Sequence, residues 1–267
     1  MSFKDKRIVV TGVSSGVGQA TAVALMNSGA YVIGLDVKAA SENANEFILC
    51  DLSNPSSIDE AVQQIKQPID GLANIAGVPG SLPADIVFKV NFLGLRHLTC
   101  LLLPKLADKA SVVNVASTAG AGWRNRMPLS KQLLTLSDWQ QCLQGFQALE
   151  MDAVSTYDFT KELVILYTML VASQQRHRGV RVNSISPGAV CTPILADFYD
   201  TMGDELLQSL KKQAGGRDAY PDEIAGAILL MLDSKGFWIN GTDVIVDGGA
   251  EVLMNLESLA TPPRPFN

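Results

Sequence analysis

The chain has 267 residues, of which 47% are hydrophobic and 18% are charged, and its net charge is −6. This balance is typical of a globular protein with a sizeable core and excludes a disordered chain. Because the net charge is negative and the sequence contains no basic run, we expect no nucleic-acid partner.

The sequence also lacks signals for membrane targeting and metal binding. The first residues, MSFKDKRIVV, do not have the apolar centre of a signal peptide, and no apolar stretch reaches the roughly 18 residues that a membrane helix needs. The four cysteines lie far apart, and there are only two histidines. We expect a cytoplasmic protein with reduced thiols, no metal site and no membrane association. The cysteines are Cys50, Cys100, Cys142 and Cys191.

Short apolar runs alternate with amphipathic stretches, which predicts strands alternating with helices. In chain order, the predicted elements are a strand at Arg7–Thr11, a helix at Gly16–Ser28, strands at Tyr31–Leu35 and Phe47–Cys50, a helix at Pro55–Lys66, a strand at Ile69–Ile75, a helix at Ala84–Leu106, a strand at Ser111–Ala116, a helix at Val154–His177, a strand at Val180–Ser186, a helix at Asp222–Leu232 and a strand at Asp243–Val246.

Buried strands that are each followed by a helix form a parallel sheet covered on both faces. With no internal repeat and no linker, the pattern predicts one α/β domain over residues 1–267, a Rossmann-type doubly wound parallel sheet of about seven strands. Two segments fall outside the alternation. Gly120–Ala153 is an insert with its own apolar residues, and Thr261–Asn267 is a proline-rich tail that we expect to be extended or frayed.

A glycine-rich turn, TGVSSGVG, joins the first strand to the first helix. Gly12 permits a tight turn, Gly16 lets the backbone approach a pyrophosphate, and Gly18 lets the helix pack close to the strand. The free N–H groups at the start of the helix then face the phosphates. The turn residues expected to bind a dinucleotide are Gly12, Ser14, Ser15, Gly16, Val17 and Gly18.

The same turn also matches the G-x-S-x-G nucleophile elbow of hydrolases, with Ser14 as the nucleophile. That motif belongs after several strands and needs a histidine late in the chain. Only His97 and His177 exist, so the dinucleotide interpretation is favoured.

Asp36 ends the second predicted strand, 18 residues after Gly18. A carboxylate there accepts hydrogen bonds from the adenosine ribose and repels a 2′-phosphate. Its neighbour Val37 offers no cation for a phosphate, although Lys38 follows. We therefore expect NAD(H) rather than NADP(H) as the cofactor. The alternative for Asp36 is a purely structural residue that starts a turn.

Tyr157 and Lys161 lie one helical turn apart and share a face of the predicted helix. An ammonium group near a phenol favours the phenolate, so we expect Lys161 to lower the pKa of Tyr157. Tyr157 would then exchange a proton with an alcohol or ketone near neutral pH. The alternative is a buried packing tyrosine beside a solvated lysine.

Taken in order, these motifs resemble those of the short-chain dehydrogenase/reductase family. The matching segments are Thr11–Gly18, the N-x-A-G stretch Asn74–Gly77, Asn91 in the long helix, Ser117 after the fifth strand, Tyr157 with Lys161, Pro187-Gly188 followed by Thr192, and Asp247-Gly248-Gly249. The resemblance extends over nearly the whole chain. It implies an NAD(H)-dependent alcohol dehydrogenase or carbonyl reductase whose single domain binds the dinucleotide and carries the catalytic residues.

The resemblance also implies roles for individual residues. Tyr157 is the acid/base, Lys161 also holds the nicotinamide ribose, Ser117 hydrogen-bonds the substrate oxygen, and Asn91 anchors a water molecule in a proton relay. Further cofactor contacts are implied for Asp51 and Leu52 at the adenine, for Asn74, Ala76 and Gly77 in the loop after the fourth strand, and for Pro187, Gly188, Val190 and Thr192 near the nicotinamide. Alternatively, Asp51 starts a turn and Asn74 stabilises the end of the sheet.

Two departures from the family pattern stand out. Ile75 replaces the usual second asparagine, and 40 residues separate Ser117 from Tyr157 because of the insert. The insert, with the stretches Asn74–Gly80 and Trp238–Gly241, resembles the bacterial 3α-hydroxysteroid dehydrogenase/carbonyl reductase and coniferyl-alcohol dehydrogenase group. That resemblance implies a bulky apolar substrate: a hydroxysteroid, an aryl alcohol or an aromatic carbonyl.

We expect the insert Gly120–Ala153 to form one or two short helices over the substrate mouth. It would obstruct the usual family pairing through Val154–His177, and the resemblance to this group implies a homodimer built around Asp222–Val246 instead. The alternative is an insert that only caps the sheet edge. Two other functions stay open: a non-catalytic NAD(H)-binding regulator, and a sugar-nucleotide epimerase or dehydratase. The epimerase spacing needs glycine where Ser15 stands.

Overall fold

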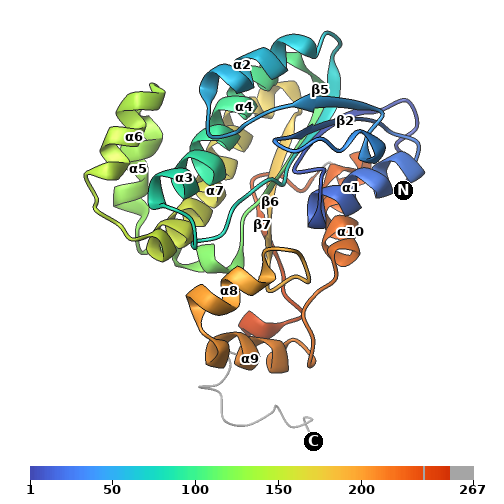
Figure 1. Cartoon of the computed structure of the whole chain (residues 1–267). Coiled ribbons are helices and arrows are strands. Elements are labelled where there is room, and N and C mark those ends of the chain that lie inside the picture. Colours follow the sequence, from blue (N-terminus) through green and yellow to red (C-terminus); the bar gives the residue numbers. More distant parts are fainter. Residues whose placement is uncertain (237, 253–267) are drawn as a thin grey trace, which may run out of the picture.

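Seven parallel strands form a single sheet in the order β3-β2-β1-β4-β5-β6-β7, with helices on both faces (Figure 1). The computed structural model describes residues 1–236 and 238–252, so the tail Thr261–Asn267 lies outside the described residues. The arrangement confirms the predicted doubly wound α/β fold. The strands are β1 (Arg7–Thr11), β2 (Tyr31–Asp36), β3 (Glu46–Leu49), β4 (Ile69–Asn74), β5 (Leu106–Val115), β6 (Arg181–Pro187) and β7 (Asp243–Val246).

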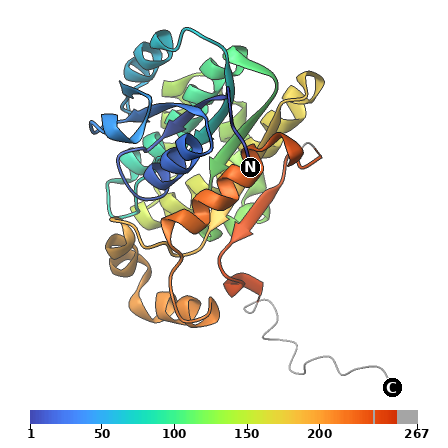
Figure 2. The same ribbon diagram turned by 90° about the vertical axis from the view of Figure 1, so that its right-hand side faces the viewer.

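Two helical layers cover the sheet. Helices α1 (Gly16–Asn27) and α10 (Pro221–Leu232) lie side by side on one face (Figure 2). Helices α2 (Pro55–Gln64), α4 (Leu95–Leu102) and α7 (Ala153–Gln175) cover the other. Short 3-10 turns connect several elements: η1 (Ser41–Asn43), η5 (Arg176–Arg178) and η6 (Ser234–Gly236).

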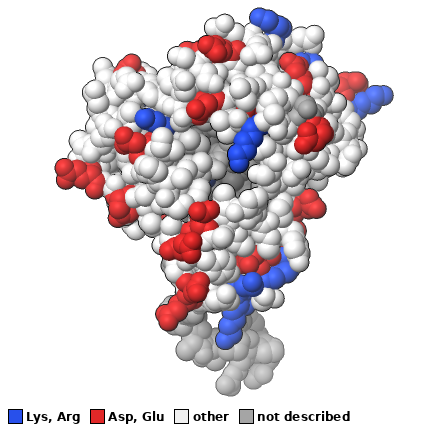
Figure 3. Space-filling view, viewed as in Figure 1, with Lys and Arg blue, Asp and Glu red and all other residues white. Residues whose placement is uncertain are grey.

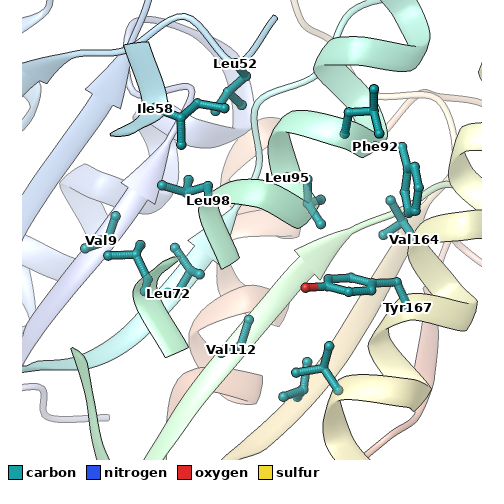
Figure 4. Close-up of a cluster of buried hydrophobic side chains, with 14 of the residues drawn as sticks. Val9, Leu52, Ile58, Leu72, Phe92, Leu95, Leu98, Val112, Val164 and Tyr167 are labelled. Atoms are coloured by element: carbon teal, nitrogen blue, oxygen red, sulfur yellow. The ribbon is translucent and has the colours of Figure 1, made fainter. Parts of the chain in front are cut away.

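The central strands divide their side chains between two apolar cores. On β1, Val9 packs with residues of α4 and α7, whereas Val10 packs with residues of α1 and α10. Figure 4 shows the first of these cores, where Leu72 and Val112 of the sheet lie beneath Leu98 of α4. Successive residues of a strand face opposite sides of the sheet, and both sides are buried. The strand sequences are therefore continuous apolar runs.

The long helix predicted at Ala84–Leu106 is not uniform. It consists of α3 (Ala84–Phe88), the π-helical turn η2 (Lys89–Gly94), α4 and the 3-10 turn η3 (Leu103–Lys105). Within the described residues this composite helix is the one segment long and apolar enough to cross a membrane, where we expected none, but more than half of it is buried in the core. It is therefore a core helix of the sheet layer, and the π-helical turn marks a position often used by functional residues.

Two helices that the sequence analysis did not predict follow β6. These are α8 (Leu195–Met202) and α9 (Asp204–Gln213), and Figure 1 shows them below the sheet, beyond the carboxyl ends of its strands. The insert contains the 3-10 turn η4 (Thr118–Arg124) and two short helices, as expected: α5 (Met127–Thr135) and α6 (Trp139–Gln147). Helices α5 and α6 pack on the outer side of α3 and α7, away from α8 and α9.

A buried ion pair fastens the insert to α7. The guanidinium of Arg126 donates to both carboxylate oxygens of Glu162 at 2.7–3.0 Å, and the Glu162 side chain is only 1% exposed. At Gly120, a Cβ would lie 2.9 Å from the carbonyl carbon of Lys161, so the backbone of η4 lies directly on α7. Arg96 of α4 also donates to the carbonyl groups at the end of α5. The insert is therefore a fixed layer of the domain.

We predict that Arg126→Met lowers the free energy of unfolding by about 3 kcal/mol, because it leaves the Glu162 carboxylate buried and unpaired. Urea denaturation at neutral pH measures the change. The double variant Arg126→Met/Glu162→Met should recover most of the loss, since an apolar pair of similar size often replaces a buried ion pair without penalty. The control is Arg124→Met, whose exposed guanidinium stacks on Trp123. If Arg126→Met costs no more than this control, the ion pair does not fasten the insert.

Candidate active site

A cavity opens at the carboxyl ends of β1, β4, β5 and β6, between these strands and α8. Its volume is about 850 Å³ with its open side included. Figure 3 shows a hollow in the middle of the same face, with mostly uncharged residues around it. Many residues expected from the sequence line this cavity: Gly12, Ser15, Gly16, Val17, Gly18, Ala76, Gly77, Ser117, Tyr157, Lys161, Pro187, Gly188, Val190 and Thr192.

The glycine turn has the backbone geometry that a close phosphate contact requires. Gly12 has a φ of +79° and Gly16 a φ of +55°, and a Cβ at Gly18 would lie 2.1 Å from the Gly12 carbonyl oxygen. The N-cap residue Ser15 makes no side-chain hydrogen bond to α1, and the first turn contains no acidic residue. The first N–H groups of α1 are thus open to an anion from the cavity, which fits the pyrophosphate of a dinucleotide.

Asp36 lies beside this turn. Its carboxylate accepts hydrogen bonds from the backbone N–H groups of Ser14 and Lys38, both at 2.9 Å. The bond to Lys38 is the turn-forming contact considered as the structural alternative. The bond to Ser14 holds the carboxylate against the glycine turn, which is where a residue that binds the adenosine ribose would lie. Asp36 can therefore both start the turn and bind the ribose.

Five residues expected at the cofactor do not line the cavity: Ser14 and Asp36, which lie at the glycine turn, and Asp51, Leu52 and Asn74. Asp51 accepts a hydrogen bond from the Ser53 N–H at 2.8 Å and so starts a turn, and the neighbouring Leu52 is buried. Asn74 is buried in the sheet, where its amide donates to the Thr99 hydroxyl at 2.9 Å and to the side chain of Asn114 at 2.8 Å. These contacts match the structural alternatives for Asp51 and Asn74.

The loop after β4 is held by Thr11 rather than by Asn74. The Thr11 hydroxyl accepts hydrogen bonds from the N–H groups of Ile75 and Ala76 at 2.8 and 3.0 Å. The sequence analysis assigned no role to Thr11 beyond its place in the motif. A hydroxyl at the last position of a buried strand was the available signal, because such a group needs hydrogen-bond partners from neighbouring loops.

Asn91 lies in the π-helical turn η2 and is also tied to this loop. Its side-chain oxygen accepts from the Val78 N–H at 2.8 Å, and its amide donates to the Val78 carbonyl at 2.9 Å. A Cβ at Gly77 would lie 3.3 Å from the Asn91 side-chain oxygen and 3.7 Å from Lys161 Nζ. Asn91 therefore positions a wall of the cavity next to the lysine, and its role in a water relay stays a prediction.

Tyr157, Lys161 and Ser117 meet at the base of the cavity. Tyr157 and Lys161 share a face of α7, and Ser117 follows β5 as the N-cap of η4. Lys161 Nζ donates to the Val115 carbonyl at 3.1 Å and lies 5.4 Å from the centre of the Tyr157 ring. The Ser117 hydroxyl lies close enough to the Tyr157 phenol to lower its pKa.

The protonation of this trio differs from the sequence-based expectation. Burial raises the pKa of Tyr157 above its usual value, and the hydrogen bond from Ser117 only partly opposes this effect. Burial lowers the pKa of Lys161 to about 8. The net shift is thus opposite to the expected lowering of the Tyr157 pKa, because burial dominates and the Lys161 ammonium group donates to Val115 rather than to the phenol. At neutral pH Tyr157 is a neutral phenol, ready to donate a proton.

Helix α8 supplies cavity residues that the sequence analysis missed. The Phe198 ring lies 5.2 Å from the Tyr157 ring, and Pro193 and Ile194 line the same wall. Among the described residues that line this cavity, none comes from 120–153. Helix α8 borders this cavity, and the Arg126–Glu162 pair fastens the insert to α7. A lid formed by Gly120–Ala153 over the mouth stays a prediction.

Comparison with known proteins identifies the family. Residues 6–129 match the short chain dehydrogenase family model, and residues 145–251 match the enoyl-(acyl carrier protein) reductase model. Coniferyl-alcohol dehydrogenase of Pseudomonas sp. (strain HR199 / DSM 7063) is 40% identical over 93% of this chain and 98% of its own. The 3-alpha-hydroxysteroid dehydrogenase/carbonyl reductase of Comamonas testosteroni is 27% identical over 92% of this chain and 97% of its own.

A solved structure shows the same architecture. The 3-alpha-hydroxysteroid dehydrogenase from Pseudomonas sp. B-0831, complexed with NADH, is similar with a TM-score of 0.79 and 27% identity, over 94% of this chain and 99% of that one. The chain therefore belongs to the short-chain dehydrogenase/reductase family and is an oxidoreductase that interconverts alcohols and carbonyl compounds with a nicotinamide cofactor.

Proposed function

We propose that the enzyme uses NAD(H) to interconvert a bulky, apolar secondary or allylic alcohol and its carbonyl. Candidate substrates are an aryl allylic alcohol, a hydroxysteroid or an aromatic carbonyl compound. The observation that carries the proposal is the meeting of Ser117, Tyr157 and Lys161 in one cavity with the uncapped start of α1. The names of the similar proteins support the substrate class, as do the apolar side chains of Ile194 and Phe198 in the cavity wall.

The cofactor would be held by the glycine turn at its phosphates, by Asp36 at the adenosine ribose, by Lys161 at the nicotinamide ribose, and by Val190 and Thr192 near the nicotinamide. When bound, the nicotinamide gives a hydride to the carbonyl carbon or takes one from the alcohol carbon.

The protein supplies binding and the proton. The hydroxyl groups of Ser117 and Tyr157 bind the substrate oxygen between them. In reduction, the Tyr157 phenol gives its proton to that oxygen, and in oxidation the phenolate takes the proton back. The Lys161 ammonium group stabilises the phenolate once the proton has left.

We also propose a cytoplasmic location and a homodimer. All four cysteines are free, and Cys100 and Cys191 are exposed, as fits a reducing compartment. Apolar side chains lie exposed on α10 and on the edge strand β7, where Leu230 is 53% exposed and Ile245 is 46% exposed. The outer side of α7 is covered in part by α5, which supports pairing through α10 and β7.

For the cofactor, we predict that the wild-type enzyme prefers NAD(H), and that Asp36→Ala reduces the preference by about 10- to 100-fold, because a hydrogen-bonding carboxylate and its repulsion of a 2′-phosphate disappear together. The measurement is kcat/KM with NAD(H) and NADP(H) in parallel. Asp36→Asn serves as the control, since it keeps a hydrogen-bonding group but removes the charge. Equal or better efficiency of the wild type with NADP(H) would contradict the proposal.

For the proton donor, we predict that Tyr157→Phe lowers kcat by about 10²- to 10⁴-fold, because a positioned acid/base is lost. Binding of NADH, followed by its fluorescence, should be unchanged, since the phenol is not needed to hold the cofactor. Lys161→Ala should impair both turnover and cofactor binding. A Tyr157→Phe enzyme with near-normal turnover would remove Tyr157 from the mechanism.

For the assembly, we predict that Leu230→Glu combined with Ile245→Glu converts the dimer to a monomer, because it places charges in an apolar interface. Light scattering after gel filtration gives the mass of each variant. The matched control is Leu170→Glu on α7, where Leu170 is 39% exposed. If only the Leu170 variant dissociates, the subunits pair through α7 instead.

A further inference from the structure

One peptide group in the glycine turn is held from both sides by side chains. The carboxylate of Asp36, at the end of β2, accepts from the Ser14 N–H at 2.9 Å. The side-chain amide of Asn43, in η1, donates to the Val13 carbonyl at 2.9 Å. The Val13 carbonyl and the Ser14 N–H belong to the same peptide, and in a trans peptide they point in opposite directions. This peptide therefore cannot turn over without losing both hydrogen bonds.

Asn43 is itself fixed by contacts with α1 and β2. It ends η1 and is 6% exposed. Its side-chain oxygen accepts from the Gln19 amide of α1 at 3.4 Å, so its nitrogen faces the Val13 carbonyl. Asn45 accepts from the Val32 N–H with its side chain and donates its own N–H to the Val32 carbonyl, at 2.8 and 3.0 Å. These bonds fasten the segment that carries Asn43 to β2.

The first half of the glycine turn packs tightly on β2. The Gly12 N–H donates to the Leu35 carbonyl at 2.8 Å, and the Val13 side chain is fully buried. A Cβ at Gly34 would lie 2.8 Å from Val13 and 2.9 Å from Ala44, so the turn and the residue after η1 meet over this glycine. The second half of the turn lines the cavity. The Val13–Ser14 peptide is thus the link between the anchored half and the half that would meet the phosphates.

The two hydrogen bonds differ in what a bound dinucleotide would do to them. In the proposed function, the Asp36 carboxylate serves the hydroxyl groups of the ribose as well as the N–H groups of Ser14 and Lys38. Competition from the hydroxyl groups loosens that side of the peptide. A peptide that turned over would direct the Val13 carbonyl oxygen at the carboxylate, and two acceptors repel each other. Asn43 has no such competitor, and its donor keeps the carbonyl on the opposite side.

We propose that Asn43 is a positioning residue for the cofactor. It keeps the Val13–Ser14 peptide in the orientation in which Asp36 and the glycine turn together accept the adenosine end of NAD(H). This inference rests on the proposed function. Because Asn43 acts through the turn and does not touch the reacting groups, it should affect binding of the cofactor and not the chemical step.

The test compares Asn43→Asp with Asn45→Asp. Both variants add one carboxylate to the same segment, but only the first removes a donor, because the Asn45 side chain acts as an acceptor for Val32. We expect Asn43→Asp to raise the Kd of NADH, followed by its fluorescence, about 10- to 100-fold, the range for a carbonyl that loses its donor. Its kcat at saturating cofactor should stay unchanged. Asn45→Asp should bind NADH as the wild type does. Equal Kd values for the two variants, or a fall in kcat that matches the loss of affinity, would overturn the proposal.

A second variant, Asn43→Ala, covers a charged variant that fails to fold, because it removes the donor without burying a carboxylate. It should raise the Kd of NADH and the Kd of ADP-ribose by the same factor, since ADP-ribose has the adenosine end but no nicotinamide. Wild-type affinity of this variant for both ligands would contradict the role of Asn43. A wild type that binds NADPH in preference to NADH would instead refute the proposed use of NAD(H).

Discussion

The active site depends on a buried cation, the Lys161 ammonium group. It lies where α7 crosses the end of β5, and within the described residues the Val115 carbonyl is the one acceptor assigned to it. Removal of a charge from water destabilises the charged form, which is why burial lowers the pKa of Lys161 to about 8. A desolvated ammonium group with donors to spare binds hydroxyl groups strongly, and the phenol of Tyr157, whose ring centre lies 5.4 Å away, is such a group in its surroundings.

The residues around the Lys161 ammonium group leave space for it and hold it in place. Gly77 presents no side chain near Nζ, and Gly120 lets η4 lie directly on the backbone of Lys161. Asn91 holds the loop that forms the opposite wall. Glu162, the residue after Lys161, pairs with Arg126. This ion pair holds the segment that follows Ser117 in place against α7. The reacting groups thus keep their places because rigid elements cross at this point, as a preorganised site requires.

The sequence predicted the parts of the fold that have a strong local pattern. Central strands such as β1 and β4 are apolar on both faces and were found with nearly correct bounds. The first half of β5, LADKA, has no such run, so the prediction began at Ser111. The π-helical turn η2 keeps the apolar spacing of the helix around it, so the sequence pattern did not distinguish it from an α-helix. Helix α9 did leave one, since acidic residues begin it and Lys211 and Lys212 end it.

The sequence predicted which residues form the active site, but it did not predict their hydrogen bonds and burial. The spacing of Tyr157 and Lys161 fixed their shared face of α7, yet it could not show that the ammonium group donates to Val115. The roles implied for Asp51 and Asn74 came from the motif. The Asp51 carboxylate accepts from Ser53 two residues on, whereas the Asn74 amide donates to Thr99 in another segment of the chain. Burial and long-range hydrogen bonds decide a pKa, and neither can be read from a local pattern.

The position of the insert also depends on long-range contacts that a local sequence pattern does not show. This position has a consequence for substrate specificity. Its apolar residues predicted helices but not the surface that they cover. In the fold, Phe146 of α6 stacks on Phe88 of α3 with ring centres 4.0 Å apart, and both rings are buried. The added layer thickens the support of α7, whereas α8 borders the cavity. Because the contacts of α8 and α9 with other helices and strands are mainly with each other, their sequence can change with the substrate while the trio of Ser117, Tyr157 and Lys161 stays in place.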